Sequence, residues 1–307
     1  MVRLICPYNA GANLKKNIFL AQRKSLLEIH LATILFGLAG LFGKWLTLSP
    51  LLIVLGRVLF ASLALGAWLW WKRQNLRDIL KTQAGLLVLL GGILAVHWGA
   101  FFQAIQVSSV AVGLLSYSCF PVFTVLLEPL FFRDKIDRKS LLASGICLSG
   151  VFLIVPRFDL ADSVYRGVLW GLLSGLTFAV LTLFNRRLVQ KYSSLAIAFF
   201  QDLSAAFLLL PSLMMMAPAG LAARDLGLLV VLGVFCTAIS HTLFIRGMRQ
   251  VPARSASIIS SLEPVYGIVL AFVFLGESPS PRTLSGGVVI MAAVIFVTLR
   301  EGARHRD

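Results

Sequence analysis

The chain has 307 residues, of which 58% are hydrophobic and only 13% charged, and its mean hydropathy is +0.89. Soluble domains carry roughly a quarter charged residues, so this composition cannot cover a globular surface with polar groups. It argues against a soluble enzyme or a disordered chain and favours a protein that crosses a membrane many times. The 28 Lys and Arg against 13 Asp and Glu give a formal net charge of +15, whose distribution has to be explained.

Ten apolar stretches have about the 20 residues that an α-helix needs to cross roughly 30 Å of hydrocarbon. They lie at about 27–47, 51–71, 84–105, 110–132, 139–156, 166–185, 194–216, 224–245, 254–275 and 282–299. The fifth and tenth are the shortest. The connections are too short for an extramembrane domain, which leaves 1–26 and 301–307 as tails. The first 25 residues lack the pattern of a removable signal peptide.

The basic residues predict how these helices are oriented. Of the 28 Lys and Arg, 22 fall in the two tails and in the four connections on the same side as the tails, and four fall in the opposite connections. Cytoplasmic loops of membrane proteins carry such an excess, so we expect an even number of spans and cytoplasmic termini. Because the charges are spread over six short segments, they do not form one basic face, which argues against nucleic-acid binding.

An internal repeat relates the two halves. Residues 107–155 align without gaps with 250–298, which pairs Pro121 with Pro264 and Asp134 with Glu277. Each half then holds five spans, an odd number, so the halves face opposite ways across the membrane. We therefore expect an all-α polytopic membrane protein built from two inverted five-helix repeats, 27–156 and 157–300. Transporters use such an architecture, with the binding site near the midplane between the halves.

The repeated segments carry a resemblance to a known family. The stretch Ser261-Leu-Glu-Pro-Val-Tyr-Gly, followed by Phe274-Leu-Gly-Glu277, resembles the EamA family of the drug/metabolite transporter (DMT) superfamily. The first half has Phe120-Pro-Val-Phe and then Phe131-Phe-Arg-Asp134, with Asp where the family usually has Glu. The resemblance covers about 28–300. It implies ten helices, cytoplasmic termini, and export of amino acids or other small metabolites across a bacterial inner membrane.

Glu263 is the deepest acid in the predicted spans. It lies about eight residues, or ~12 Å, into the ninth span, close to the midplane. Ionisable groups there usually face a cavity or a partner, so Glu263 either accepts a substrate ammonium or a proton, or pairs with a cation such as Arg57. Its repeat counterpart Phe120 would face it, which suits a substrate with one cationic and one apolar end. Pro121 and Pro264 follow directly and either free a carbonyl for the cavity or form static kinks.

Two histidines bracket the predicted midplane, His97 in the outer half and His241 in the inner half. They either carry protons during transport or are buried and bonded to a neighbouring carbonyl. We also place in the pathway Trp98 and Phe101 as stacking partners, and Tyr117 and Tyr266 as hydroxyl donors near the prolines; ordinary packing is the alternative for each.

Lys44 and Arg57 lie near outer helix ends, where both can snorkel to the interface. Lys44 could also hold a substrate carboxylate. Asp134 and Glu277, at helix ends, are expected to be structural acids. The small residues Gly171 and Gly175 would let helices approach closely, within the bundle or at a dimer face.

These features predict a secondary transporter that works by alternating access. The chain has no GxxxxGK[ST] loop for ATP and no HExxH or similar hydrolase motif. Its four cysteines lack metal-ligand spacing, so we expect no metal site. The missing catalytic motifs lead us to expect no enzymatic activity, and we expect no cofactor. Amino acids lead as exported substrates, with protons as a candidate coupling ion and a monomer or weak homodimer in the bilayer. Uptake or exchange of a riboflavin-like, sugar-linked or drug-like solute, or a subunit without transport activity, remain as alternatives.

Overall fold

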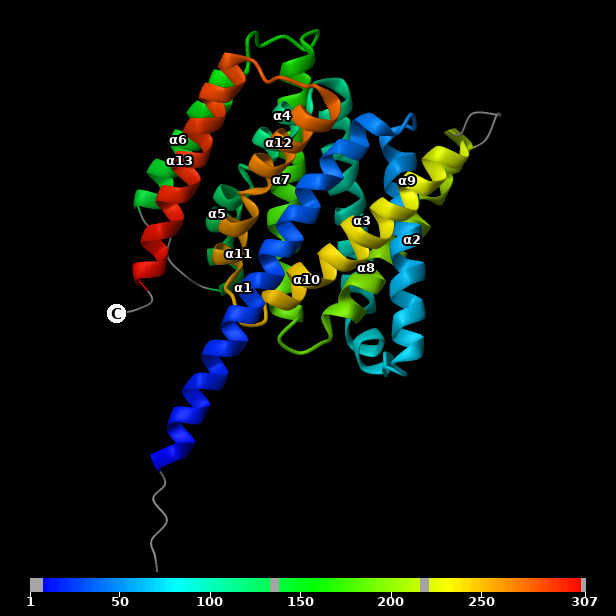
Figure 1. Cartoon of the computed structure of the whole chain (residues 1–307), viewed down its shortest axis with the longest axis vertical. Helices are drawn as coiled ribbons and strands as arrows, with labels where there is room; N and C mark the ends of the chain where they lie inside the picture. Colours follow the sequence, from blue (N-terminus) through cyan, green and yellow to red (C-terminus); the bar gives the residue numbers. More distant parts are fainter. Residues whose placement is uncertain (1–7, 133–137, 216–220, 305–307) are drawn as a thin grey trace, which may run out of the picture.

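The computed structural model describes residues 8–132, 138–215 and 221–304, and the regular structure in these ranges is helical throughout (Figure 1). The elements are α1 (Tyr8–Trp45), α2 (Pro50–Trp71), α3 (Arg77–Val107), α4 (Val110–Tyr117), α5 (Phe120–Phe132), α6 (Arg138–Ile154), α7 (Ser163–Leu188), α8 (Ser194–Leu209), the 3₁₀ helix η1 (Leu210–Met215), α9 (Ala223–Gly233), the π-helical turn η2 (Val234–Ile239), α10 (Ser240–Gly247), α11 (Ala253–Ser260), α12 (Glu263–Leu275) and α13 (Pro281–Arg304).

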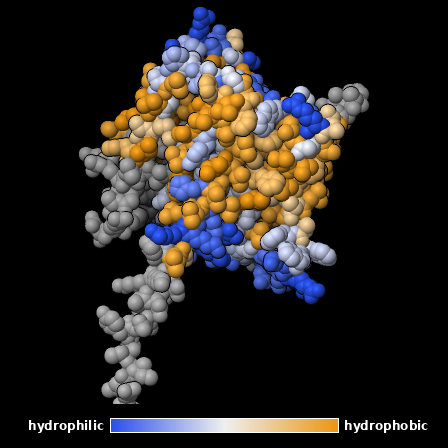
Figure 2. Space-filling view, in the orientation of Figure 1, coloured by the Kyte–Doolittle hydropathy of each residue, from blue (hydrophilic) through white to orange (hydrophobic). Residues whose placement is uncertain are grey.

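Seven stretches of the described residues are long and apolar enough to cross a membrane. They are Leu20–Trp45, Pro50–Trp71, Arg77–Val107, Val110–Phe131, Ser163–Leu188, Ser194–Met214 and Ala223–Gly247. Two further apolar helices, Gly145–Ile154 and Glu263–Leu275, are shorter. An apolar band covers the middle of the molecule and polar residues gather at its ends (Figure 2). The chain is therefore a polytopic membrane protein, while ten spans stay a prediction.

Helix α1 runs past the centre of the bundle, where it packs on α10, α11 and α12. It begins at Tyr8, well before the first apolar stretch that we predicted from position 27. The reason is that hydropathy detects only the part of a helix that is buried in protein or lipid. The polar first turns continue the same helix beyond the bundle, as its lower end in Figure 1 shows.

Helices α6 and α13 form a pair at one side of the bundle, and each packs mainly on the other (Figure 1). Gly150 of α6 faces Gly286 of α13, because a Cβ added to Gly150 would lie 2.8 Å from the Gly286 carbonyl oxygen. Small residues that allow backbones to approach are the usual means of helix packing in membranes. The α6–α13 pair thus lies to one side, and the other helices surround the centre of the bundle.

Two helix interruptions lie at equivalent places in the sequence repeat. Between α4 and α5, the Cys119 N–H donates to the Ser116 carbonyl, three residues back, at 3.4 Å. Between α11 and α12, the Leu262 N–H donates to the Ile259 carbonyl, also three residues back, at 3.1 Å. The two positions are 143 residues apart, which is the offset of the sequence alignment. Pro121 and Pro264, both buried, follow two residues later. A proline in the first turn of a new helix requires no donor there.

The segment α9–η2–α10 contains a π-helical turn in the middle of one apolar stretch. Its Thr237 hydroxyl donates to the Leu232 carbonyl five residues back at 2.8 Å. Turns of this kind commonly occur at functional sites, because they leave backbone carbonyls free of the regular helix pattern. The carbonyl of Cys236 in this turn is such a group and points to a side chain of α2.

Candidate functional site

A cavity lies between α1, α2, α3, α4, α7, α10 and α12, with about 480 Å³ of empty space that is not wholly enclosed. The room for a water-sized sphere inside it is only about 20 Å³, so the cavity is narrow in this structure. Six residues that we predicted for a transport pathway line it: His97, Trp98, Phe101, Tyr117, His241 and Glu263. The structure thus gathers these six residues from four separate helices around one space.

Glu263 is the first residue of α12 and follows the interruption directly. Its side chain is 2% exposed, and its Oε2 atom has no hydrogen-bond partner. The Tyr117 hydroxyl is its polar neighbour across the cavity. The N-terminal end of a helix carries a partial positive charge, which favours a carboxylate at this position. Glu263 therefore offers an acceptor oxygen to whatever enters the cavity.

Arg57 also lines the cavity, and here the expectation that it snorkels to the interface is wrong. Its side chain is 1% exposed, and its Nε and Nη2 donate to Thr237 Oγ1 at 2.9 Å and to the Cys236 carbonyl at 3.1 Å. Both acceptors belong to the π-helical turn. Depth along a helix cannot predict such a contact, because the facing helix decides whether a side chain turns inward.

Arg57 and Glu263 do not form a salt bridge with each other, since none of their charged atoms approach within 4.0 Å. The Arg57 guanidinium instead lies over the Trp98 ring, with 3.8 Å from its central carbon to the ring centre. One cavity therefore holds a cation and an acid that are separate. A molecule with both charges could contact each of them.

The two histidines have different surroundings. His97 Nδ1 lies 3.0 Å from both the carbonyl oxygen and the hydroxyl of Ser174, and its ring stacks on Phe178. His241 Nδ1 lies 3.6 Å from Asp202 Oδ1, beyond hydrogen-bond distance. Both Asp202 oxygens lack hydrogen-bond partners although the residue is fully buried. His97 is thus held by a neighbouring serine, while the His241–Asp202 pair is incompletely satisfied.

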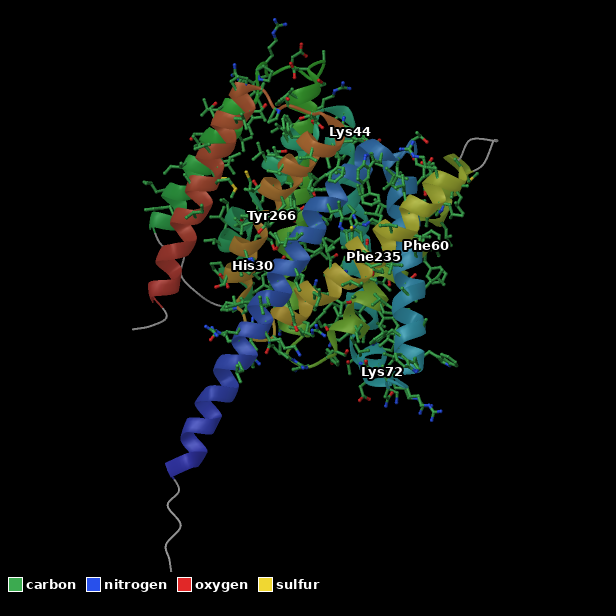
Figure 3. The ribbon with its side chains drawn as sticks, in the orientation of Figure 1. His30, Lys44, Phe60, Lys72, Phe235 and Tyr266 are labelled. Carbon is green, nitrogen blue, oxygen red and sulfur yellow. The ribbon has the colours of Figure 1, made fainter. Side chains whose placement is uncertain are left out.

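The remaining predicted site residues do not line the cavity. Phe120 packs behind Tyr117, with ring centres 5.0 Å apart. Lys44, exposed near the end of α1, donates to the Ser108 carbonyl at 3.0 Å, and the Cβ of Tyr266 lies against Gly37 of α1 (Figure 3).

Of the two predicted structural acids, one is described. Glu277 accepts a hydrogen bond from the Val110 N–H at 2.8 Å and thereby caps α4. Asp134 lies outside the described residues. The glycines Gly171 and Gly175 of α7 pack inside the bundle, because a Cβ on either would meet Ser116 or the Tyr117 carbonyl.

The sequence reasoning missed several cavity residues besides Arg57. Asn185 lines the cavity and accepts a hydrogen bond from Gln201 at 2.7 Å. In the sequence it stands next to two arginines, a pattern typical of a loop rather than of a cavity wall. Phe36, Phe178 and Phe244 complete the aromatic wall. Among the 22 phenylalanines of the chain, nothing in the sequence distinguishes these three.

A helical membrane bundle with a central charged cavity is the form of a small-solute transporter. The sequence model of the EamA-like transporter family matches residues 23–155 and again 165–299. The chain belongs to this family, which confirms the resemblance seen in the sequence.

Individual relatives are also transporters. An uncharacterized transporter, YxxF of Bacillus subtilis, is 28% identical over 90% of each chain. A probable terminal-alkyne amino-acid exporter of Streptantibioticus cattleyicolor is 26% identical, over 89% of this chain and 88% of its own. An S-adenosylmethionine uptake transporter of Rickettsia felis is 25% identical, over 80% and 81%. A crystal structure with 19% identity has a TM-score of 0.67 and covers 90% of this chain and 96% of its own, which supports the fold.

Proposed function

We propose that this protein exports amino acids or closely related small metabolites as a secondary transporter. The observation that carries the proposal is that Arg57 and Glu263 line the same cavity but form no salt bridge with each other. An α-amino acid presents an ammonium and a carboxylate at a fixed short separation. Glu263 accepts the ammonium through its unpaired Oε2, and Arg57 receives the carboxylate.

The bonding of Arg57 supports this role. A guanidinium has five N–H donors, and two of them are used by Thr237 and Cys236. The others remain for a planar carboxylate, which Arg binds well through paired hydrogen bonds. Arg57 thus takes the role that we considered for Lys44. The aromatic wall with Trp98 and Phe101 suits an apolar side chain of the substrate.

We further propose ten spans in two inverted repeats, 27–156 and 157–300, that rock about the cavity. The support is threefold: the family model matches the chain twice, the helix interruptions at Cys119 and Leu262 share their hydrogen-bond pattern, and 22 of 28 basic residues fall on one predicted side. Discontinuous helices at the midplane are a recurring feature of such transporters. The charge asymmetry favours cytoplasmic termini in a bacterial inner membrane.

Protons are the coupling ion that the buried charges favour. Arg57 faces two buried carboxylates, Asp202 and Glu263, so the group carries a net charge of −1 unless it holds a proton. A net charge is costly in a low-dielectric interior, and one proton on His241 or a carboxylate neutralises the group. A zwitterionic amino acid adds no net charge, so it displaces the proton by competition, because Glu263 cannot hold a proton and the substrate ammonium at the same time. This predicts exchange of one proton for one substrate ammonium.

Uptake is the second candidate, because the Rickettsia relative is named for it. Reconstitution tests both directions. The purified chain in liposomes should move radiolabelled amino acids, either from a mixed panel inside or from outside, and a proton gradient should accelerate one direction. If neither amino acids nor other metabolites cross in excess of empty liposomes, the protein is no transporter by itself. If only metabolites without a paired ammonium and carboxylate cross, the substrate class is wrong.

A further inference from the structure

The turn between α2 and α3 holds Arg73 in the left-handed region, with φ of 49°. Among the residues that the structure describes, it is the one non-glycine with positive φ. The Arg73 and Gln74 N–H groups donate to the Trp70 and Leu69 carbonyls at 3.0 and 3.1 Å, which is the hydrogen-bonded end of a helix that usually has glycine at this position. A side chain is unfavourable there, so its presence calls for a role.

Arg73 lines a groove between the end of α2 and the start of α8. The groove has about 1270 Å³ of empty space, part of it open to the outside. Its walls are mainly apolar, and the Phe199 ring lies so close to α2 that a Cβ on Gly66 would be 3.1 Å from it. Exposed apolar residues of α2, such as Leu63, continue along the same helix toward the middle of the bilayer.

Aromatic residues mark this end of α2 as the level of the lipid headgroups. Trp70, 83% exposed, lines the groove, and Trp68 and Trp71 are also exposed. Tryptophan is enriched at this level of a membrane. Lys72 lies 4.9 Å from the centre of the Trp71 ring, at the polar edge of the molecule (Figures 2 and 3).

The charge at the groove is positive. Arg73 lines it and Lys72 adjoins it, whereas no acid does so among the described residues; the nearest in sequence, Asp78, is in the first turn of α3. A free anion would match these charges but would leave the apolar walls unfilled. A phospholipid matches both features. Its phosphate can lie beside Arg73 at the headgroup level, and the acyl chain attached to the same molecule can fill the apolar groove below it.

We propose that this groove is a binding site for an anionic phospholipid. The Arg73 guanidinium holds the phosphate, Lys72 adds a second positive charge, and one acyl chain lies along the groove beside Gly66 and Phe199. A zwitterionic lipid has its own cation near the phosphate and is therefore held less strongly by two basic residues. The site is separate from the central cavity and does not depend on which solute is transported.

Lipid selectivity measured by tryptophan fluorescence tests the proposal. The full chain is placed in vesicles of phosphatidylglycerol and phosphatidylcholine, with bromine on the acyl chains of phosphatidylglycerol alone, so that quenching reports its enrichment near the tryptophans. Arg73→Gln should lower the preference for phosphatidylglycerol about fivefold. This factor corresponds to the binding free energy that one basic residue contributes at an anionic membrane surface. Arg77→Gln removes a matched charge from the same turn outside the groove and should leave the preference within twofold of the wild type.

A second variant separates lipid binding from folding. Arg73→Gly removes the side chain and relieves the left-handed backbone, so it should raise the unfolding temperature while it lowers the lipid preference as Arg73→Gln does. The proposal is overturned if Arg73→Gln and Arg77→Gln weaken the preference equally, since diffuse surface charge then explains it. An unchanged preference in both Arg73 variants overturns it as well.

Discussion

The guanidinium carbon of Arg57 lies 3.8 Å from the centre of the Trp98 ring, and this stack joins α2 to α3 at the wall of the cavity. The same guanidinium bonds to the π-helical turn through Thr237 and Cys236. A planar, delocalised cation is required for both contacts, and a lysine ammonium cannot make them together.

Arg57→Lys should therefore lower the rate of amino-acid transport at least tenfold although the charge is kept. The loss of one charge-assisted hydrogen bond, about 1.5–3 kcal/mol, corresponds to a factor of this size or more. Transport in liposomes measures the effect. Lys44→Arg, a matched exchange of cation type outside the cavity, should transport at the wild-type rate. Equal activity of Arg57→Lys and wild type would separate the guanidinium from substrate binding.

Glu263→Gln should abolish transport without preventing folding or membrane insertion. The amide is nearly isosteric with the carboxylate, but it carries neither the charge for an ammonium nor an exchangeable acidic proton. Export from cells and transport in liposomes are the measurements, with size-exclusion behaviour of the purified variant as the check on folding. Glu277→Gln is the matched control, because Glu277 caps α4 away from the cavity. Wild-type export by Glu263→Gln would remove Glu263 from the mechanism.

Asp202→Asn should separate substrate exchange from proton coupling. The pair of Asp202 and His241 is buried beside the cavity, while Glu263 and Arg57 remain to bind the substrate. The variant should keep counterflow of a labelled amino acid against unlabelled substrate and lose acceleration by an imposed proton gradient. A dye that reports internal pH should show no substrate-dependent proton movement. A variant that couples as well as the wild type would assign the proton to Glu263 alone.

Gly171→Ala should destabilise the bundle by about 1–3 kcal/mol, as an extra methylene does in a packed interior. A Cβ at this position would collide with the Ser116 hydroxyl oxygen, whose proton is donated to the Val112 carbonyl. Thermal unfolding in detergent measures the change. Gly85→Ala adds the same methyl in α3 where nothing lies within 4 Å, so it should be neutral or stabilising. Equal stability of both variants would mean that α7 and α4 are less closely packed.

The sequence predicted which apolar segments become helices and placed Glu263 near the cavity. Both predictions depend only on local properties of the sequence, namely the length of an apolar segment and the position of an acid within it. Apolar length predicts a membrane helix, and an acid far from both helix ends rarely faces lipid. The helix interruption before Glu263 was only partly foreseen. Proline predicted a kink, but the switch to a three-residue hydrogen bond at Leu262 depends on the local backbone.

The partners of the cavity residues could not be predicted, because they come from helices that are distant in the sequence. Arg57 and Lys44 have similar depths in their segments, yet one is buried against η2 and the other is exposed beside Ser108. Phe120 was paired with Glu263 by position in the repeat, but it packs behind Tyr117. Equivalent positions in two repeats need not have equivalent rotamers or neighbours.

The π-helical turn of Val234–Ile239 contains one residue more than a regular turn would need. Deletion of a single residue there would let the segment close into an uninterrupted α-helix. Because the wide turn absorbs the extra residue, the helices on its two sides would keep roughly their relative orientation after the deletion. The Cys236 carbonyl, however, would return to the regular hydrogen-bond pattern of the helix and be lost to Arg57. The length of this one turn thus decides whether a backbone carbonyl is available to the guanidinium at the cavity wall.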